Sequence, residues 1–185
     1  MLAIHEGSIQ VLLSAGYRKL TTTRVAERTG VSVGTLYQYF PNRQALIRAV
    51  LERYLMEMSV SIEADCAALR GRSLDEIGAG MVDAMIAAKW RRLDVSRAMH
   101  EPLVEIGGAE LVRASAARGA SFVADLLRSS PEIGRVDVEP LAVFLVMACT
   151  SMLQAAFIEY AADKETIRAH MNAMVRGYLR EMRAR

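Results

Sequence analysis

The stretch TTTRVAERTGVSVGTLYQYFPNRQAL, residues 21–46, contains two short amphipathic segments separated by a glycine. Thr21 or Thr22 offers a hydroxyl that caps a first helix, and Gly30 ends that helix after about two turns, because glycine adopts the left-handed conformation at low cost. Ser32 then caps a second short helix. Two short helices joined by a tight glycine-containing turn are the helix-turn-helix arrangement, so this stretch predicts one.

The segments on either side of this stretch also have helical periodicity. Residues 4–15 predict a helix before it, and a long helix is expected from Arg43 towards Ala68. The rest of the chain continues as apolar stripes at helical spacing with short breaks, and no Val/Ile/Thr-rich alternation persists long enough to predict a sheet. We therefore expect an all-α protein, with a three-helix domain at residues 1–48 and a larger helical domain at residues 49–185.

Composition narrows the class of protein. The chain has 185 residues, of which 52% are apolar and 6% aromatic, enough to bury one or two cores. Cys66 and Cys149 lie in apolar helical surroundings without the close spacing of metal or redox motifs, which indicates core residues in a reducing cytosol. The first residues have no secretory signal pattern. We expect a cytoplasmic protein without a cofactor or metal.

Charge is distributed unevenly along the chain. The net charge is +2, and residues 1–56 carry seven Lys or Arg side chains against three Glu. This excess favours an anionic partner for the first third only, although an ordinary solvated face can have the same composition.

Hydroxyl groups are concentrated in the second short helix of the predicted motif. A helix that presents its N-terminus to the major groove brings free N–H groups to the phosphates. Thr35 and Tyr37 can donate to phosphate oxygens, Tyr39 can reach a phosphate or a base edge, and Gly34 allows the backbone to lie close to the duplex. The alternative is that both tyrosines are half-buried packing residues.

Residues 4–52, including Gly16-Tyr17, closely resemble the DNA-binding signature of the TetR family of bacterial transcriptional regulators. The resemblance implies contacts to duplex DNA from the start of the second helix, from the recognition helix and from the start of the fourth helix, where Arg43 stands in place of a common Lys. Arg24, a basic residue near the start of the second helix, belongs to the same predicted surface. The predicted DNA contacts are Thr21, Thr22, Thr23, Arg24, Val33, Gly34, Thr35, Tyr37, Tyr39 and Arg43. Val33 and Gly34 offer few hydrogen bonds to bases, which favours recognition of DNA shape.

Beyond residue 52 the resemblance is architectural. It implies a C-terminal domain that binds a small-molecule effector and forms a homodimer through the last two helices, and a regulator, most often a repressor, that binds palindromic operator DNA. Residues 141–158 are apolar all round and about long enough to cross a bilayer, but Thr150, Ser151 and Gln154 argue against a membrane span. Cover by the chain's own domain and by a second subunit explains the same pattern.

Methionine and aromatic residues supply candidates for the effector pocket. Methionine is a flexible side chain suited to irregular apolar ligands, yet a methionine stripe at helical spacing is more often plain core. The predicted pocket residues are Met81, Met85, Trp90, Met99, His100, Phe122, Met147 and Met152.

Two other classes of protein compete with a DNA-binding regulator. An α-helical enzyme is disfavoured because His5, His100 and His170 are far apart, and the chain has no phosphate-binding glycine loop and no nucleophile motif. A non-catalytic helical interaction or scaffold bundle stays open as the alternative, and would be favoured if the basic N-terminal third did not bind duplex DNA.

Overall fold

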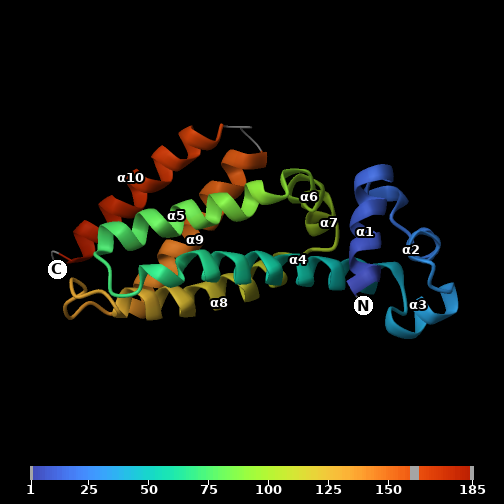
Figure 1. Cartoon of the computed structure of the whole chain (residues 1–185), viewed down its shortest axis with the longest axis horizontal. Coiled ribbons are helices and arrows are strands. Elements are labelled where there is room, and N and C mark those ends of the chain that lie inside the picture. The colour runs from blue at the N-terminus through green and yellow to red at the C-terminus, as the bar shows by residue number, and fades with distance from the viewer. Residues whose placement is uncertain (1, 159–162, 184–185) are drawn as a thin grey trace. The chain divides into compact units, whose positions relative to one another are not determined.

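The computed structural model describes residues 2–158 and 163–183, and within these residues it is built of helices without a strand (Figure 1). The prediction of an all-α fold is confirmed. The elements follow the order α1 (Leu2–Ala15), the 3-10 turn η1 (Tyr17–Lys19), α2 (Thr22–Thr29), α3 (Val33–Tyr39), α4 (Arg43–Cys66), the 3-10 turn η2 (Ala67–Leu69), α5 (Leu74–Arg91), α6 (Leu93–Ala98), α7 (His100–Glu105), α8 (Ala109–Arg128), α9 (Val138–Ile158) and α10 (Lys164–Arg183).

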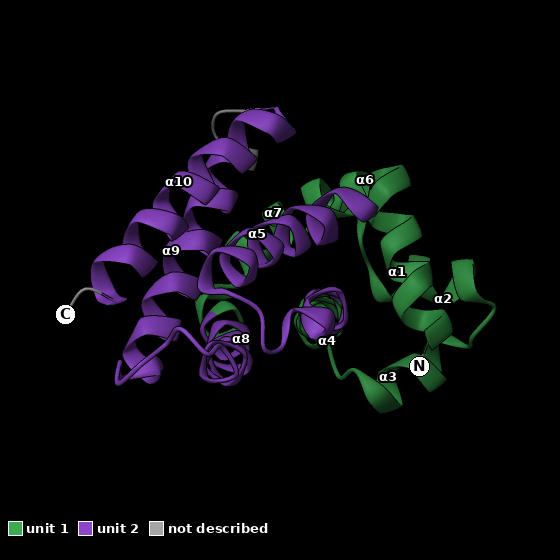
Figure 2. Ribbon diagram, turned by 60° about the vertical axis from the view of Figure 1, so that its left-hand side comes forward, with its two compact units in different colours: residues 1–57, 92–112 green, residues 58–91, 113–185 purple. Residues whose placement is uncertain are grey.

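These helices pack as two compact units, coloured separately in Figure 2. Unit 1 comprises Met1–Glu57 and Arg92–Val112, and unit 2 comprises Met58–Arg91 and Arg113–Arg185. α6 and α7 belong to unit 1 because Val95 of α6 and Met99, which joins the two helices, are buried in the same apolar core as α1 to α3, and Leu103 of α7 packs against it. These two units therefore do not coincide with the expected domains at residues 1–48 and 49–185. The expected division describes functional domains, and it stays a prediction.

Helix ends in the N-terminal part follow local chemistry. The hydroxyl of Thr21 accepts a hydrogen bond from the Arg24 backbone N–H at 3.3 Å and caps α2. Gly30, with φ of 71°, ends that helix in the left-handed conformation, and the Ser32 hydroxyl accepts from the Thr35 N–H at 3.0 Å to cap α3. The helix starts and stops expected from the sequence are confirmed here.

The two units have separate apolar cores. Leu36 and Val25 are fully enclosed in unit 1, so the inner faces of α2 and α3 pack against α1 and α4. In unit 2, α5 and α10 run antiparallel, as the ion pairs Arg168–Asp83 and Arg176–Asp75 at opposite ends of the contact show. Each core is continuous enough to hold its unit together by apolar burial.

α9 is apolar on both its inner and its outer side. Val138–Ala156 is long and apolar enough to cross a membrane by length and composition, a test that core helices of soluble proteins also pass, and 39% of that window is buried. Leu141, Leu145 and Cys149 form part of the core of unit 2. The outward face carries exposed Val143, Phe144 and Met147 in the described structure.

His5 places an ionisable group inside the core of unit 1. Its side chain is 8% exposed, and its Nε2 atom has no hydrogen-bond partner among the described residues. Burial lowers the pKa of His5 below 6.5, an effect that nearby Glu57 and Glu6 oppose and Arg53 reinforces. A positive charge at this position is therefore disfavoured in the folded chain.

We expect the free energy of unfolding of unit 1 to fall as the pH drops below about 6.5. Because the folded-state pKa of His5 is depressed, the unfolded chain binds more protons than the folded chain in this pH range. The contribution of neutral His5 to the free energy of unfolding is therefore fully present only above its unfolded-state pKa. Urea denaturation at pH 7.5 and pH 5.5 measures the effect, and His5→Leu should reduce the pH dependence. The same substitution at exposed His170 is the control, and an unchanged pH dependence in His5→Leu would contradict the assignment.

Candidate nucleic-acid interface

α3 is a seven-residue helix with one buried side and one exposed side. Leu36 is fully enclosed and Phe40, directly after the helix, is 7% exposed, so both hold the helix from behind as expected. Tyr37 and Tyr39 are 49% and 59% exposed. These exposures argue against the alternative in which both tyrosines pack inside the protein.

The exposed side of α3 also carries Val33, Gly34, Thr35 and Gln38. A Cβ added to Gly34 would meet only the Ser32 hydroxyl, at 3.9 Å, so the space outside the Gly34 backbone is open. A ligand can approach the main chain closely at this point. The major groove of duplex DNA is wide enough to admit a short exposed helix of this kind.

The Thr35 hydroxyl is already hydrogen-bonded within the helix cap. It lies 2.8 Å from the Ser32 hydroxyl, which also accepts the Thr35 N–H. Thr35 keeps capacity for up to two further hydrogen bonds, because a hydroxyl combines one donor with two acceptor sites and only one of the three is used. Its orientation is fixed before any ligand arrives.

Tyr37 and Thr22 form a hydrogen-bonded pair between α3 and α2. The Thr22 hydroxyl donates to the Tyr37 hydroxyl at 3.2 Å, and Thr22 itself is 5% exposed. The sequence predicts Thr22 as a direct DNA contact, but this burial leaves its hydroxyl little access to a phosphate. With its oxygen accepting from Thr22, the Tyr37 hydroxyl still has its own proton to donate outward.

Arg43 opens α4 as expected, but it makes contacts that the sequence did not predict. Its Nε donates to the Leu20 carbonyl at 2.7 Å and its Nη2 to the Tyr17 carbonyl at 2.8 Å. The guanidinium also lies over the Tyr17 ring, with Cζ 4.4 Å from the ring centroid. Three of its interactions are therefore made inside unit 1.

Basic side chains near these helices are available for an anionic partner. Arg18, Lys19 and Arg24 are exposed and form no ion pair with any residue that the structure describes. Thr21 is half-buried as the cap of α2, and Thr23 is exposed beside it. Unneutralised cations next to exposed hydroxyls suit the phosphate backbone of DNA.

Gln38 is a candidate that sequence analysis missed. On a helical wheel with 100° per residue it lies almost opposite buried Leu36, and in the part of the chain that the structure describes its amide makes no hydrogen bond. A free amide presents a donor and an acceptor together, the pattern that recognises adenine in the major groove. The spacing from Leu36 is the sequence signal that could have found it.

The predicted pocket residues are divided between the two units. Met81, Met85, Trp90, Phe122 and Met152 belong to the core cluster of unit 2 or pack against it. Met99 is buried in the core of unit 1, His100 lies in the same unit, and Met147 is 55% exposed on α9. The helical stripe of methionines is thus largely core, as the alternative interpretation of that pattern stated.

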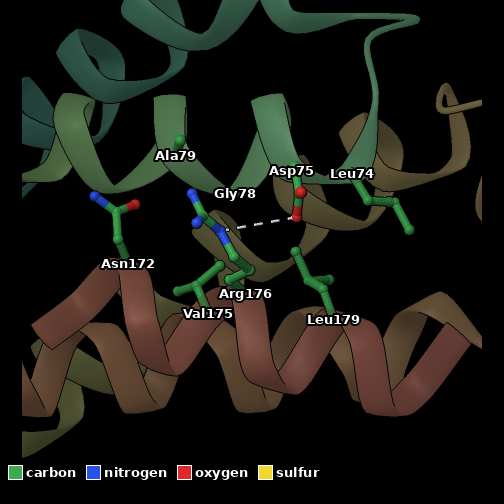
Figure 3. Close-up of a pocket in the computed structure, with 8 residues that line it drawn as sticks. All are labelled: Leu74, Asp75, Gly78, Ala79, Asn172, Val175, Arg176 and Leu179. Carbon is green, nitrogen blue, oxygen red and sulfur yellow. Dashed lines mark ion pairs between the residues drawn. The ribbon is translucent and has the colours of Figure 1, made fainter. Parts of the chain in front are cut away.

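A shallow cleft lies between α5 and α10, and none of the predicted pocket residues lines it (Figure 3). Gly78 is one of the residues that line it, and an added Cβ there would lie 2.8 Å from Val175 Cγ1, so glycine allows the two helices to approach closely. Asp75 and Arg176 face each other across the cleft at 4.0 Å. These contacts describe a helix interface better than a ligand pocket.

Ionisable groups inside unit 2 have displaced pKa values. Burial lowers the pKa of Lys89 to about 8, and its Nζ donates to Gln154 Oε1 at 3.3 Å. Burial also raises the pKa of Cys66 to about 11 and that of Cys149 to about 12, so both thiols stay protonated and unreactive at neutral pH. No group of side chains suited to a metal ion occurs among the described residues.

Family models match most of the chain. The model described as "Bacterial regulatory proteins, tetR family" matches residues 4–50, and the model "Tetracyclin repressor-like, C-terminal domain" matches residues 73–179. Among curated relatives, the uncharacterized HTH-type transcriptional regulator YvkB of Bacillus subtilis is 37% identical over 51 residues, which cover 28% of this chain and 27% of that protein. The HTH-type transcriptional repressor KstR of Mycolicibacterium smegmatis is 35% identical over 68 residues, 37% of this chain and 32% of that protein. The match with these two relatives thus spans about a quarter to a third of their length.

Solved structures share the fold over nearly the whole chain. The multidrug binding protein EbrR, solved with imidazole, superposes with a TM-score of 0.67 at 19% identity, covering 93% of this chain and 92% of that one. The fatty acid degradation regulator FadR of Bacillus halodurans gives a TM-score of 0.69 at 12% identity, covering 94% and 92%. At these identities the likeness establishes the fold alone.

We expect Thr22 to act on DNA affinity through Tyr37. Tyr37→Phe should weaken duplex binding about fivefold, the scale of one lost hydrogen bond. Thr22→Val should weaken it when Tyr37 is present but add nothing in the Tyr37→Phe background, since its partner oxygen is gone. Fluorescence anisotropy with a labelled duplex measures this double-mutant cycle.

Thr23→Val is the matched control for that cycle, because Thr23 is exposed and has no bond to Tyr37. Its effect should add to that of Tyr37→Phe. Additive effects of Thr22→Val and Tyr37→Phe would instead show that the two hydroxyls act separately.

Proposed function

Because the chain belongs to the TetR family of bacterial regulatory proteins, we propose that it binds operator DNA through α2 and α3 and regulates transcription. The observation that carries this proposal is the exposed side of α3, where Tyr37, Gln38 and Tyr39 face solvent while Leu36 anchors the helix. The exposed cations Arg18, Lys19 and Arg24 supply sequence-independent attraction to phosphates. Catalysis is not part of the proposal, and we place the protein in the cytoplasm, where its DNA partner lies.

The DNA contacts divide into those that hold the backbone and those that read bases. Tyr37, Thr21, Thr23 and Arg24 offer hydroxyl or cationic groups suited to phosphates, and Thr35 joins them with its remaining hydrogen-bonding capacity. The base-reading groups then lie on α3. Val33 offers an apolar contact for a thymine methyl, Gly34 a close backbone approach, and Gln38 and Tyr39 polar atoms for base edges; these four are exposed.

We further propose that the protein is a homodimer formed through α9 and α10. Met147 lies three residues from Phe144 and four from Val143, so these exposed side chains make one apolar stripe on α9. On α10 the exposed residues Ala169, Ala173 and Gly177 make a stripe of small side chains, which lets a second helix approach. Two copies paired in a four-helix bundle would place two α3 helices on successive major grooves about 34 Å apart, and the operator would be a palindrome.

An effector response in unit 2 and a repressor role complete the proposal. KstR is named a repressor and EbrR a multidrug binding protein, and both properties come to this chain by likeness only. Of the predicted pocket residues, Met81, Met85, Trp90, Phe122 and Met152 share one core cluster and are kept as candidates. Flexible methionines can rearrange around an apolar ligand, and a switch needs about 1–3 kcal/mol of coupling between ligand and DNA sites.

Fluorescence anisotropy with a duplex from the chain's own upstream region tests the DNA-binding function. Arg24→Ala should weaken binding to every sequence and lower the salt slope by about one, whereas Gln38→Ala and Tyr39→Ala should also change sequence preference. Arg135→Ala is the control, because Arg135 is an exposed arginine of unit 2 that pairs with none of the residues that the structure describes. Repeating the titration with a panel of small apolar compounds tests the effector response as a change in Kd of about 5- to 150-fold.

Failure of the wild-type chain to bind any duplex at low salt would overturn the proposed function and leave the helical scaffold as the remaining candidate. Equal affinities for wild type, Arg24→Ala and Arg135→Ala would show that DNA does not bind at the predicted surface, even if it binds elsewhere on the protein.

We expect Phe144→Glu to convert the dimer into a monomer. A charge at this 62% exposed apolar position costs nothing in the monomer but must be desolvated in the dimer. Sedimentation equilibrium measures the mass, and affinity for a palindromic duplex should fall because the second half-site is lost. Val104→Glu is the matched control, since Val104 is 64% exposed on α7; a Phe144→Glu protein that stays dimeric would exclude this interface.

A further inference from the structure

Arg43 connects the start of α4 to the chain that leads into α2. Its Nε–Leu20 and Nη2–Tyr17 hydrogen bonds, 2.7 and 2.8 Å long, span 23 and 26 residues of sequence. Both acceptors are backbone carbonyls, and hydrogen bonds from a charged donor are short and roughly twice as strong as neutral ones. Arg43 therefore fixes the path of the main chain rather than the position of another side chain.

The segment that Arg43 holds, residues 16–20, is a short turn. Gly16 enters it with φ of 80°, and the 3-10 turn η1 is closed by the hydrogen bonds Lys19 N–H to Gly16 and Leu20 N–H to Tyr17. Tyr17 and Leu20 are buried, which anchors the turn from the inside. The Leu20 carbonyl immediately precedes Thr21, the cap of α2.

Stacking adds a second constraint that depends on the guanidinium. The planar group lies over the Tyr17 ring at 4.4 Å while its edge donates to the two carbonyls. A lysine ammonium is a point charge and cannot stack and form two directed bonds in this way. The geometry thus needs arginine, although a phosphate contact would accept lysine as well.

We propose that Arg43 is a positioning residue that locks residues 16–20 and so sets the start of α2 for DNA, instead of acting mainly as a phosphate contact. The DNA part of this inference rests on the proposed function, whereas the structural part does not. Two of its donor groups are engaged before DNA arrives. Thr21 and Thr23, which follow the locked segment, carry hydroxyls that the proposed function assigns to phosphates.

Arg43→Lys in the full chain distinguishes the two roles. Amide hydrogen exchange without DNA should become faster for residues 17–25, on the order of tenfold, because the turn loses its lock while the charge is kept. Duplex affinity should fall by a similar factor with the salt slope unchanged. Arg53→Lys is the control, since Arg53 pairs with Glu57 on the surface of α4 and should alter neither measurement.

Wild-type exchange rates in Arg43→Lys, or wild-type affinity for DNA, would overturn the proposal, because a phosphate contact tolerates lysine and leaves the free protein unchanged. If Arg43→Lys does not fold, Tyr17→Leu replaces it and removes the stacked ring while keeping an apolar side chain at this buried position. Faster exchange confined to residues 17–25 in that variant supports the lock, and uniform or unchanged exchange overturns it. If wild type binds no duplex, the proposed function fails while the exchange experiment still decides the role of Arg43.

Discussion

Burial of Leu36 is the constraint on which the N-terminal unit depends. A helix of seven residues is not stable alone, because nucleation is costly and few hydrogen bonds follow it. α3 is stabilised because the fully enclosed Leu36 side chain belongs to the same apolar core of unit 1 as Val25 and Ala26 on α2. With that side fixed, the helical period turns Gly34 and Gln38 outward and leaves Tyr37 and Thr35 at the flanks.

Around this helix, most polar groups are bonded within the protein before any ligand binds. Thr35 is held by Ser32, Tyr37 by Thr22, and Arg43 by the carbonyls before α2. Such bonds lower the conformational entropy that binding would otherwise remove, so the hydroxyl and charged groups are preorganised. Gln38 stands apart in this respect, since its amide is free among the described residues and can adapt to a base pair.

The sequence predicted features that depend on neighbours within a few residues. The caps at Thr21 and Ser32, the glycine that ends α2 and the buried position of Leu36 all follow from local chemistry and helical spacing. It could not predict the partners of Arg43, which come from residues more than twenty positions away. The burial of Thr22 among three consecutive threonines has the same cause, as does the assignment of Met99 and Met81 to different cores, because tertiary packing decides them.

α9 illustrates why a hydrophobic pattern alone leaves its environment open. The same helix buries Leu145 and Cys149 in unit 2 and exposes Val143, Phe144 and Met147 on its other side. A membrane span and a subunit interface both require such an outer face, and length and composition do not separate them. What favours an interface is the helix beside it: α10 combines the exposed small residues Ala169, Ala173 and Gly177 with exposed Arg176 and Arg180, whose charges lie 4.0 and 3.9 Å from Asp75. Ion-paired arginines beside a stripe of small residues suit the rim of a protein interface, which is polar and accessible to water. In a membrane the same charges would lie in hydrocarbon, which is energetically costly.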